Sequence, residues 1–131
     1  MKKLSLLMLT LCFTALIFAQ EKGKPIIAFA EKSYDFGTVK EEAGKITHEF
    51  TFKNSGDAPL VIQNVVASCG CTVPTWSKEP IAPGATGVIS VTYTTTGRPN
   101  AFTKNITVAN NSAENPVILV IKGVVTPKVA Q

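Results

Sequence analysis

The sequence predicts an all-β protein, a sandwich or barrel of about seven or eight strands. Short runs of β-branched and aromatic residues alternate with turns rich in Gly, Pro, Asn and Asp, at spacings of roughly 8–12 residues. After residue 20, no stretch places apolar residues at the three- and four-residue spacing of a helix. Because no internal repeat or low-complexity tract is visible, we expect a single small domain.

The first nineteen residues predict export. Lys2 and Lys3 precede an uncharged, Leu-rich run over residues 4–18, and Ala19 supplies a small residue for cleavage, as in a secretory signal peptide. The run is shorter than the about 20 apolar residues of a transmembrane helix, so a retained anchor is the weaker alternative. Cys12 lies inside the run and is removed with it. We expect a signal peptide over residues 1–19 and one domain over residues 20–131, periplasmic or secreted, with no stable membrane anchor.

Cleavage changes the composition of the chain. Removal of Lys2 and Lys3 from thirteen basic residues leaves eleven, against nine acidic ones. Arg98 is the only arginine and no cluster of basic residues remains, which argues against a nucleic-acid partner. Three cysteines become two, and one histidine is present. These few groups limit the catalytic chemistry of the mature domain.

The expected strands follow from local patterns. Residues 46–52 alternate most strictly, with Ile46, His48, Phe50 and Phe52 on one face and polar residues on the other. Residues 80–84 contain two prolines and must be irregular. Residues 117–125 are almost continuously apolar, which indicates a strand covered on both faces. In chain order, the expected strands cover residues 25–29, 33–39, 46–52, 60–66, 88–94, 102–108 and 117–125, with polar turns between them.

Seven short motifs in a fixed order resemble a known family. They are residues 35–39 (DFGTV), 48–54 (HEFTFKN), 68–72 (SCGCT), 81–84 (IAPG), 96–98 (TGR), 102–104 (FTK) and 106–108 (ITV). Over nearly the whole mature chain, this order resembles the bacterial domain-of-unknown-function 1573 family. The resemblance implies an exported immunoglobulin-like β-sandwich, similar to the major-sperm-protein and PapD-like group, and it implies no activity. The candidate structural positions are Phe36, Gly37, Gly70, Trp76, Pro83, Gly84 and Arg98.

The motif Cys69-Gly70-Cys71 is the sharpest chemical feature, and three interpretations are open. In the first, the cysteines form a disulfide. Residues i and i+2 of an extended strand lie near the Cα limit of about 6.8 Å, so Gly70 would bend the backbone through φ values closed to other residues. In the second, two thiolates bind a soft metal. In the third, both side chains pack as small apolar groups. An oxidising compartment favours the disulfide, and so tight a ring, if exposed, would be labile.

His48 is the candidate third ligand of the metal alternative, with Cys69 and Cys71. A closed zinc site needs four protein ligands, so Cu(I) suits this set better than zinc. However, His48 shares a strand face with Ile46 and Phe50, which favours a packed, hydrogen-bonded histidine instead of a ligand. On that interpretation the domain has no cofactor.

Two further residues have both a structural and a functional interpretation. Trp76 follows the cysteine motif by five residues, and we expect it to pack in the core beside that motif, with a partner surface as the alternative. Arg98 lies in a turn between Gly97 and Pro99, and Asp35 is the first carboxylate to consider for an ion pair with it.

No pattern in the sequence supports an enzyme. With one histidine, no nucleophile can be assigned a base, and the chain has no nucleophile elbow, phosphate loop or HExxH-type spacing. We expect an exported, non-catalytic binding or structural module with an unidentified protein partner. By analogy with PapD-like domains, an exposed edge strand is a candidate attachment point. The alternative is a thiol-based redox protein or a Cu(I)-binding protein that uses Cys69 and Cys71.

Overall fold

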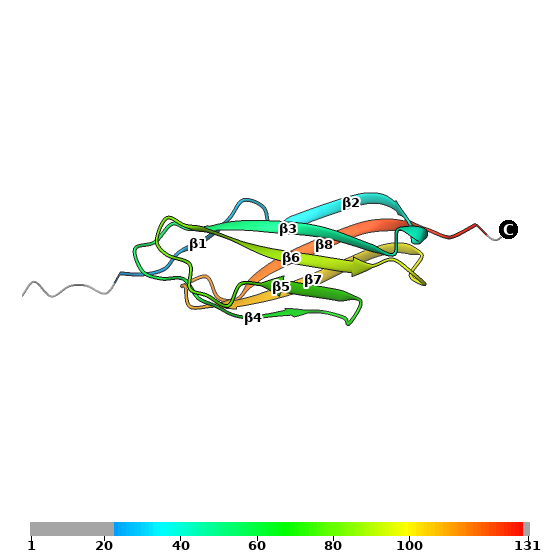
Figure 1. Ribbon diagram of the computed structural model, residues 1–131. Coiled ribbons are helices and arrows are strands. Elements are labelled where there is room, and N and C mark those ends of the chain that lie inside the picture. Colours follow the sequence, from blue (N-terminus) through cyan, green and yellow to red (C-terminus); the bar gives the residue numbers. More distant parts are fainter. Residues whose placement is uncertain (1–22, 130–131) are drawn as a thin grey trace, which may run out of the picture.

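Eight strands make up most of residues 23–129, the part of the chain that the computed structural model describes (Figure 1). They are β1 (Ile27–Phe29), β2 (Ser33–Lys40), β3 (Lys45–Asn54), β4 (Ile62–Ala67), β5 (Thr72–Trp76), β6 (Thr86–Thr94), β7 (Asn100–Asn110) and β8 (Val117–Thr126). Within this range the one helical segment is the 3-10 turn η1 (Glu41–Ala43), and no helix has the length and apolarity needed to cross a membrane. The predicted all-β class is confirmed. The predicted signal peptide, residues 1–19, lies outside the described residues.

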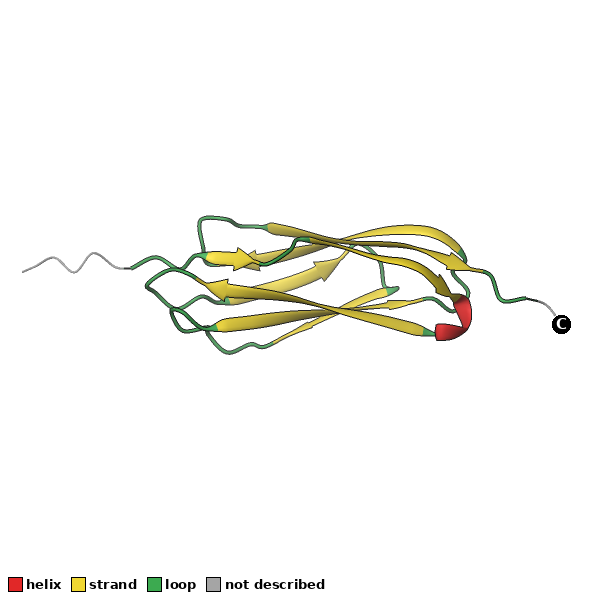
Figure 2. Cartoon of the chain, turned by 90° about the horizontal axis from the view of Figure 1, so that it is seen from above, coloured by secondary structure: helices red, strands yellow, loops and turns green. Residues whose placement is uncertain are grey.

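The strands form two four-stranded sheets that face each other (Figure 2). The first sheet has the order β1-β3-β6-β5 and the second the order β2-β8-β7-β4. The strands β1 and β2 are consecutive in the chain but belong to different sheets, so residues 30–32 cross between the layers. The strand β2 pairs with β8 in parallel, whereas the other ladders are antiparallel.

The inner faces of the sheets enclose one hydrophobic core. The strand β3 shows the predicted alternation, because Phe50 and Phe52 are buried while Thr47, Glu49 and Thr51 are exposed. Each fully buried side chain of such size contributes about 1.5–3 kcal/mol, so this burial is the main stabilising contribution. The buried apolar residues are Ile27, Phe50, Phe52, Leu60, Ile62, Val65, Cys71, Ile89, Val91, Tyr93, Phe102, Ile106, Val108, Val117, Leu119, Ile121 and Val125.

The expectation that residues 117–125 are covered on both faces is wrong. The strand β8 alternates, with Leu119 and Ile121 fully buried and Ile118 and Val124 exposed by 43% and 45%. It lies in the middle of the second sheet, but nothing in residues 23–129 covers the outer face of that sheet. Its outward apolar residues are β-branched, and such residues favour strand geometry even on an uncovered face.

A buried asparagine fastens one end of the sandwich. Asn54 is fully buried, and its amide makes four hydrogen bonds. Its Oδ1 accepts from the N–H groups of Ile26 (3.2 Å) and Gly56 (3.0 Å), and its Nδ2 donates to the carbonyls of Ala58 (2.7 Å) and Ile81 (2.9 Å). These bonds join the segment before β1, the loop after β3 and the loop before β6. The sequence alone indicates only a turn at Asn54, because nothing local signals hydrogen-bond partners so distant in the chain.

Pro83 and Gly84 form the tight turn before β6. The N–H of Ala85 donates to the carbonyl of Ala82 (3.0 Å), and Gly84 has φ of 80°. Pro at the second position and Gly with positive φ at the third identify a type II turn. The N–H of Gly84 also donates to the backbone carbonyl of Asn54 (2.8 Å), which ties this turn to the same end of the sandwich.

Three of the four edge strands carry features that oppose pairing with a further strand. The strand β1 is only three residues long. In β2 and β4 the register is irregular. Beside each irregularity, a side-chain oxygen accepts a hydrogen bond from a backbone N–H group. Asp35 Oδ1 accepts from Gly37 N–H (2.8 Å), and Asn64 Oδ1 accepts from Val65 N–H (3.0 Å). Short strands and bulges of this kind prevent edge-to-edge association.

The fourth edge strand, β5, is protected by Pro74. The N–H of Thr94 donates to the carbonyl of Cys71 (2.9 Å), and an antiparallel ladder alternates, so Val73 and Thr75 bond toward β6 while Pro74 faces the free edge. Proline has no N–H, so this edge lacks a donor at its centre. The sequence patterns assigned no strand to residues 72–76, because a proline argues against a central strand and the edge position of this segment is not visible in the sequence.

Candidate functional site

The cysteine motif lies where the chain passes from one sheet to the other. Residues 68–71 connect β4 of the second sheet to β5 of the first, and these two strands run along the same border of the sandwich (Figure 1). Ser68 N–H donates to the carbonyl of Asn105 (3.0 Å), and Ser68 Oγ accepts from Asn105 N–H (3.3 Å). At the other end, Thr94 N–H donates to the Cys71 carbonyl. The connection is therefore held at both ends by central strands, β7 and β6.

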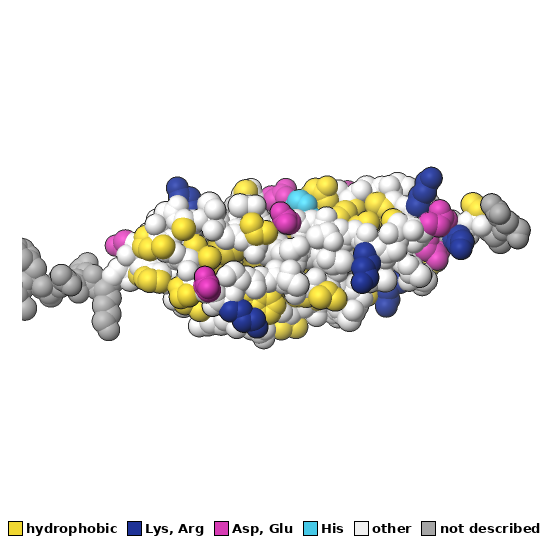
Figure 3. Space-filling model, viewed as in Figure 1, with side chains coloured by type: hydrophobic (Ala, Val, Ile, Leu, Met, Phe, Trp, Pro, Cys, Tyr) yellow, Lys and Arg dark blue, Asp and Glu magenta, His cyan; other side chains and the backbone are white. Residues whose placement is uncertain are grey.

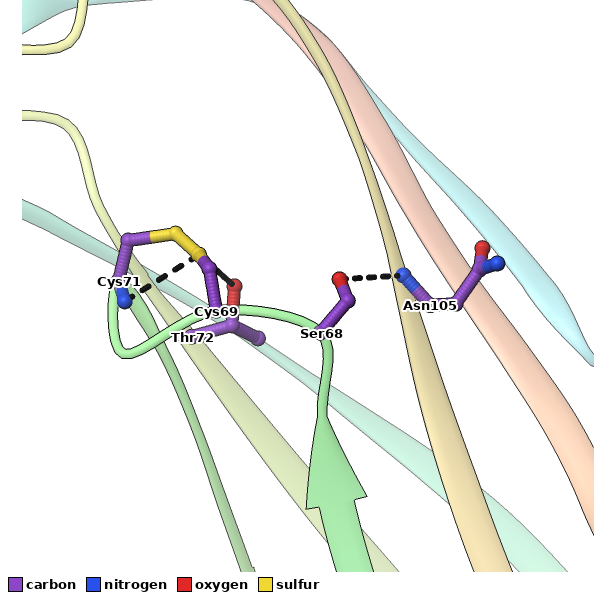
Figure 4. The surroundings of a disulfide bond; sticks show 5 residues. All are labelled: Ser68, Cys69, Cys71, Thr72 and Asn105. Atoms are coloured by element: carbon purple, nitrogen blue, oxygen red, sulfur yellow. Dashed lines mark hydrogen bonds between the residues drawn. A yellow bond between two sulfur atoms is a disulfide. The ribbon is translucent and has the colours of Figure 1, made fainter.

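In the structure a disulfide joins Cys69 and Cys71 (Figure 4). Their Cα atoms are 5.3 Å apart, within the range of about 4.4–6.8 Å that disulfides span. A turn brings them together, because Thr72 N–H donates to the Cys69 carbonyl (3.2 Å). The N–H of Cys71 also donates to Cys69 Sγ (3.2 Å). The motif therefore forms a turn at the end of β4 and does not continue the extended strand.

The expected role of Gly70 is wrong. Gly70 is not among the glycines with positive φ, and a Cβ built there would meet no atom within 4 Å other than those of its two chain neighbours. The turn is made with φ values open to any residue, so neither backbone conformation nor space requires glycine at this position.

The two cysteines differ in burial. Cys71 is 3% exposed and belongs to the hydrophobic core, whereas Cys69 is half-buried at the margin of that core. Thr72 is also 3% exposed, and its Oγ1 lies 3.7 Å from Cys71 Sγ and 3.9 Å from Cys69 Sγ (Figure 4). Within residues 23–129 these sulfurs are the only hydrogen-bond partners of that hydroxyl. The site thus combines one half-buried cysteine, one buried cysteine and one hydroxyl that can donate to either sulfur.

His48 lies in a different cluster. Its ring stacks on Tyr34 (centroids 3.6 Å apart) and meets the edge of Phe50 (4.8 Å). Its Nε2 is 2.5 Å from Glu31 Oε1, in the crossing between β1 and β2. In the described part of the chain, no three His, Cys, Asp or Glu side chains form a group that could hold a metal ion. The structure therefore places His48 with aromatic and acidic neighbours, and it does not bring His48 into a group with Cys69 and Cys71.

Phe36 and Gly37 shape the edge strand β2. The half-buried ring of Phe36 contacts Tyr34 edge-on (5.0 Å) and faces Phe102 at 6.3 Å. Gly37 has φ of 70°, which a residue with a side chain rarely adopts, at the irregularity where Asp35 accepts its N–H. Phe36 packs against the core, and Gly37 provides the positive φ at the irregularity of the strand.

Trp76 is half-buried at the end of β5 and packs against the core, with Lys78 Nζ 5.0 Å from the centre of its indole ring. Arg98 is exposed, and no ion pair joins it to Asp35 in residues 23–129. Its charge acts instead on Tyr93, which lies opposite Thr72 in the β5–β6 ladder. Burial raises the pKa of the Tyr93 hydroxyl, and the Arg98 guanidinium partly opposes this rise.

Thr72 is the site residue that sequence reasoning missed. The alternation of β5 carries a signal for it, since Thr72 shares its parity with Trp76 and therefore points inward beside the second cysteine. That signal becomes readable only once residues 72–76 are recognised as a strand.

A family model described as a protein of unknown function (DUF1573) matches residues 27–125. The chain belongs to the DUF1573 family. No curated protein matches the sequence significantly.

Solved structures share the fold of this DUF1573 chain. It resembles the PapD-like domain 7 of human CEP192, with a TM-score of 0.66, 8% identity, and coverage of 81% of this chain and 89% of that one. It is also similar to a protein of unknown function from Porphyromonas gingivalis W83 (TM-score 0.63, 16% identity) and to the secreted serine protease VesC from Vibrio cholerae (0.58, 17%). The DUF1573 chain covers 51% and 23% of the lengths of these two chains, and they cover 86% and 76% of it. The expected family and the immunoglobulin-like sandwich are confirmed.

Proposed function

We propose that this chain is an exported, non-catalytic binding module that docks a protein partner on the outer face of its second sheet. The observation that supports this most strongly is a group of exposed apolar side chains on that face. Val66 of β4 is 53% exposed, and Ile118 and Val124 of β8 are 43% and 45% exposed. Apolar groups gathered on one exposed face are characteristic of interaction surfaces.

The register arranges two of these side chains in one row. Val66 lies opposite Thr107 of β7, and Thr107 lies opposite Ile118 of β8. Opposite residues on neighbouring antiparallel strands have Cβ atoms about 4.5–5.5 Å apart, so the three side chains form a continuous strip across the sheet. A partner that covers this strip gains about 25 cal/mol for each Å² of apolar surface removed from water.

Docking on a sheet face is favoured over addition of a strand at a sheet edge. Addition of a strand needs free N–H and C=O groups along an edge, and the four edges of this sandwich are short, bulged or interrupted by proline. Figure 3, in the view of Figure 1, shows charged and hydrophobic side chains dispersed among uncharged ones over β3 and β6 of the first sheet.

The proposed occupant is a domain of another exported protein. The predicted signal peptide supports the exported setting. The similarity to the P. gingivalis chain and to VesC supports the kind of partner, because this fold matches only 51% and 23% of those longer chains. A sandwich of this type can therefore exist beside other folded domains.

Photo-crosslinking from defined positions tests the proposal. A photoreactive amino acid at position 66 or 118 of the full chain, expressed in its bacterium, should capture a protein partner. Val73 and Val88 are matched controls, since they are 53% and 41% exposed on the outer face of the first sheet. Val66→Glu combined with Ile118→Glu should abolish capture from position 124. Equal capture from both faces, or capture only from edge positions 35 and 74, would contradict docking on this face.

The second candidate function is the thiol-based one, favoured by two adjacent sulfurs on a loop that reaches the surface. Cu(I) binding requires the reduced pair, because thiolates are the ligands that this ion prefers. Titration of the reduced chain with Cu(I) should then saturate at one ion per chain, and Cys69→Ser should abolish it. A reduced wild-type chain that takes up no Cu(I) excludes the metal form of this candidate.

A further inference from the structure

We infer that Cys69 and Cys71 form a thiol–disulfide exchange site of fixed polarity, which accepts electrons from a dithiol reductant. In this site an incoming thiolate attacks Cys69 Sγ, and Cys71 leaves as a thiolate. The inference concerns the chemistry of the loop alone and does not depend on the docking face proposed above.

Access decides which sulfur is attacked. A thiolate approaches a disulfide sulfur from the side opposite the leaving sulfur, so the attacked atom must be reachable from solvent. Cys69 is half-buried at the margin of the core, whereas Cys71 is 3% exposed among core residues. Attack on Cys71 would require the reductant to enter the sandwich, and attack on Cys69 does not.

A donor is present for the leaving group. The buried Thr72 hydroxyl lies 3.7 Å from Cys71 Sγ, and the sulfurs are its only partners among the described residues. When the bond breaks, this O–H can donate to the Cys71 thiolate, and a hydrogen bond to a charged acceptor is stronger than one to a neutral disulfide sulfur. Thr94 N–H donates to the Cys71 carbonyl (2.9 Å), so the backbone of Cys71 stays bonded to the central strand β6 when the disulfide opens.

The same placement selects a dithiol over a monothiol. After the first attack the reductant is bonded to Cys69, and Cys71 remains one residue beyond Gly70, ready to attack Cys69 and expel the reductant again. A monothiol is therefore returned unchanged in most encounters. A dithiol has a second thiolate that attacks its own bonded sulfur and releases Cys69.

The balanced reaction consumes one dithiol per disulfide. The Cys69–Cys71 bond breaks, two electrons and two protons pass from the dithiol to the two cysteines, and the dithiol becomes a cyclic disulfide. In the reverse direction the reduced chain donates the same two electrons to a disulfide substrate.

Single-cysteine variants of the purified chain test the polarity. Cys71→Ser leaves Cys69 as a free thiol, and Cys69→Ser leaves Cys71. Iodoacetamide should alkylate Cys69 in the first variant at least about tenfold faster than Cys71 in the second, and the rates should converge in denaturant. Circular dichroism establishes that both variants are folded. Equal rates in the folded variants, or a faster Cys71, would overturn the assignment.

The wild-type chain provides the second readout. Brief treatment with reduced glutathione and an acid quench should yield a mixed disulfide that peptide mapping finds on Cys69. Dithiothreitol should reduce the protein at least about tenfold faster than the same concentration of thiol groups as glutathione. A mixed disulfide on Cys71 would contradict the polarity, and equal reduction rates would contradict the selection of dithiols.

Thr72 variants test the leaving-group donor. Thr72→Val should slow reduction by dithiothreitol by about three- to tenfold, and Thr72→Ser should restore the rate, because serine keeps the hydroxyl. Thr75→Val is the matched control, since Thr75 is an exposed threonine of the same strand, and it should react like the wild type. A Thr72→Val chain that is folded and reduced at the wild-type rate would remove Thr72 from the mechanism.

Discussion

Replacement of Asn54 by alanine is expected to lower the free energy of unfolding by about 3 kcal/mol or more. The Asn54 amide serves four backbone groups, and the substitution leaves three of them without a partner. The fourth, the Ile81 carbonyl, also accepts from Leu60 N–H (2.9 Å) and stays satisfied. These hydrogen bonds are part-buried, so each lost partner is taken at the lower end of the about 1–3 kcal/mol that a buried unsatisfied group costs, which gives about 3 kcal/mol for three groups. This is a large share of the 5–15 kcal/mol typical of whole domains.

Urea unfolding followed by tryptophan fluorescence measures this loss. Trp76 is the only tryptophan, and its half-buried ring loses its packing on unfolding. The midpoint should fall by about 1–3 M at an unchanged slope, since slopes are about 1–3 kcal/mol per M. Asn105→Ala is the control, because Asn105 is exposed and its side-chain amide makes no hydrogen bond within residues 23–129, while its backbone bonds to Ser68 do not depend on the side chain. A loss below about 1 kcal/mol for Asn54→Ala would refute the view that this amide fastens the end of the sandwich.

Three other predictions address the turns, the pH response and the core. Gly84→Ala should cost about 1–2 kcal/mol because its φ is 80°, whereas Gly70→Ala should stay within about 0.5 kcal/mol in the same urea assay. Because burial raises the pKa of Tyr93, its contribution to stability is complete below the unfolded-state value of about 10 and is lost as pH rises through the folded-state value. Thermal unfolding between pH 8 and 11 should therefore show an alkaline loss that is smaller in Tyr93→Phe, and an equal loss would contradict the assignment. Ile106→Ala, at a fully buried position, should cost about 2–5 kcal/mol, and Ile118→Ala, at a 43% exposed one, should cost far less.

The parts of the fold that depend on local periodicity could be predicted from the sequence. Alternation in β3 identified which side chains face the core, and prolines identified the irregular segment before β6. Two features were missed for physical reasons. The outer face of β8 carries Ile118, Val120 and Val124 although nothing in residues 23–129 covers it, because β-branched residues suit strands in either setting. The strand β5 contains Pro74, and its place at an edge follows from tertiary topology and not from the local sequence.

The sequence located the cysteine motif but did not show how the burial of its two cysteines differs. Adjacent cysteines in an exported chain indicate a disulfide, yet the pattern says nothing of which sulfur solvent can reach. That difference arises because the motif turns between two sheets and places Cys71, but not Cys69, in the core. The contribution of Thr72 depends on the same turn. Gly70 was given a conformational role that the turn does not need.

The parallel pairing of β2 with β8 constrains how the chain acquires its structure. The second sheet joins a strand near the beginning of the domain to the last strand, and β8 lies between β2 and β7. Until residues up to Thr126 are available, β2 has no partner and β7 lacks one of its two neighbours. Pairings between segments so far apart are slow to form, because the whole intervening loop must close first. The second sheet therefore cannot be completed until β8 is available, so a chain that emerges from its N-terminus keeps β2 unpaired until its last strand arrives.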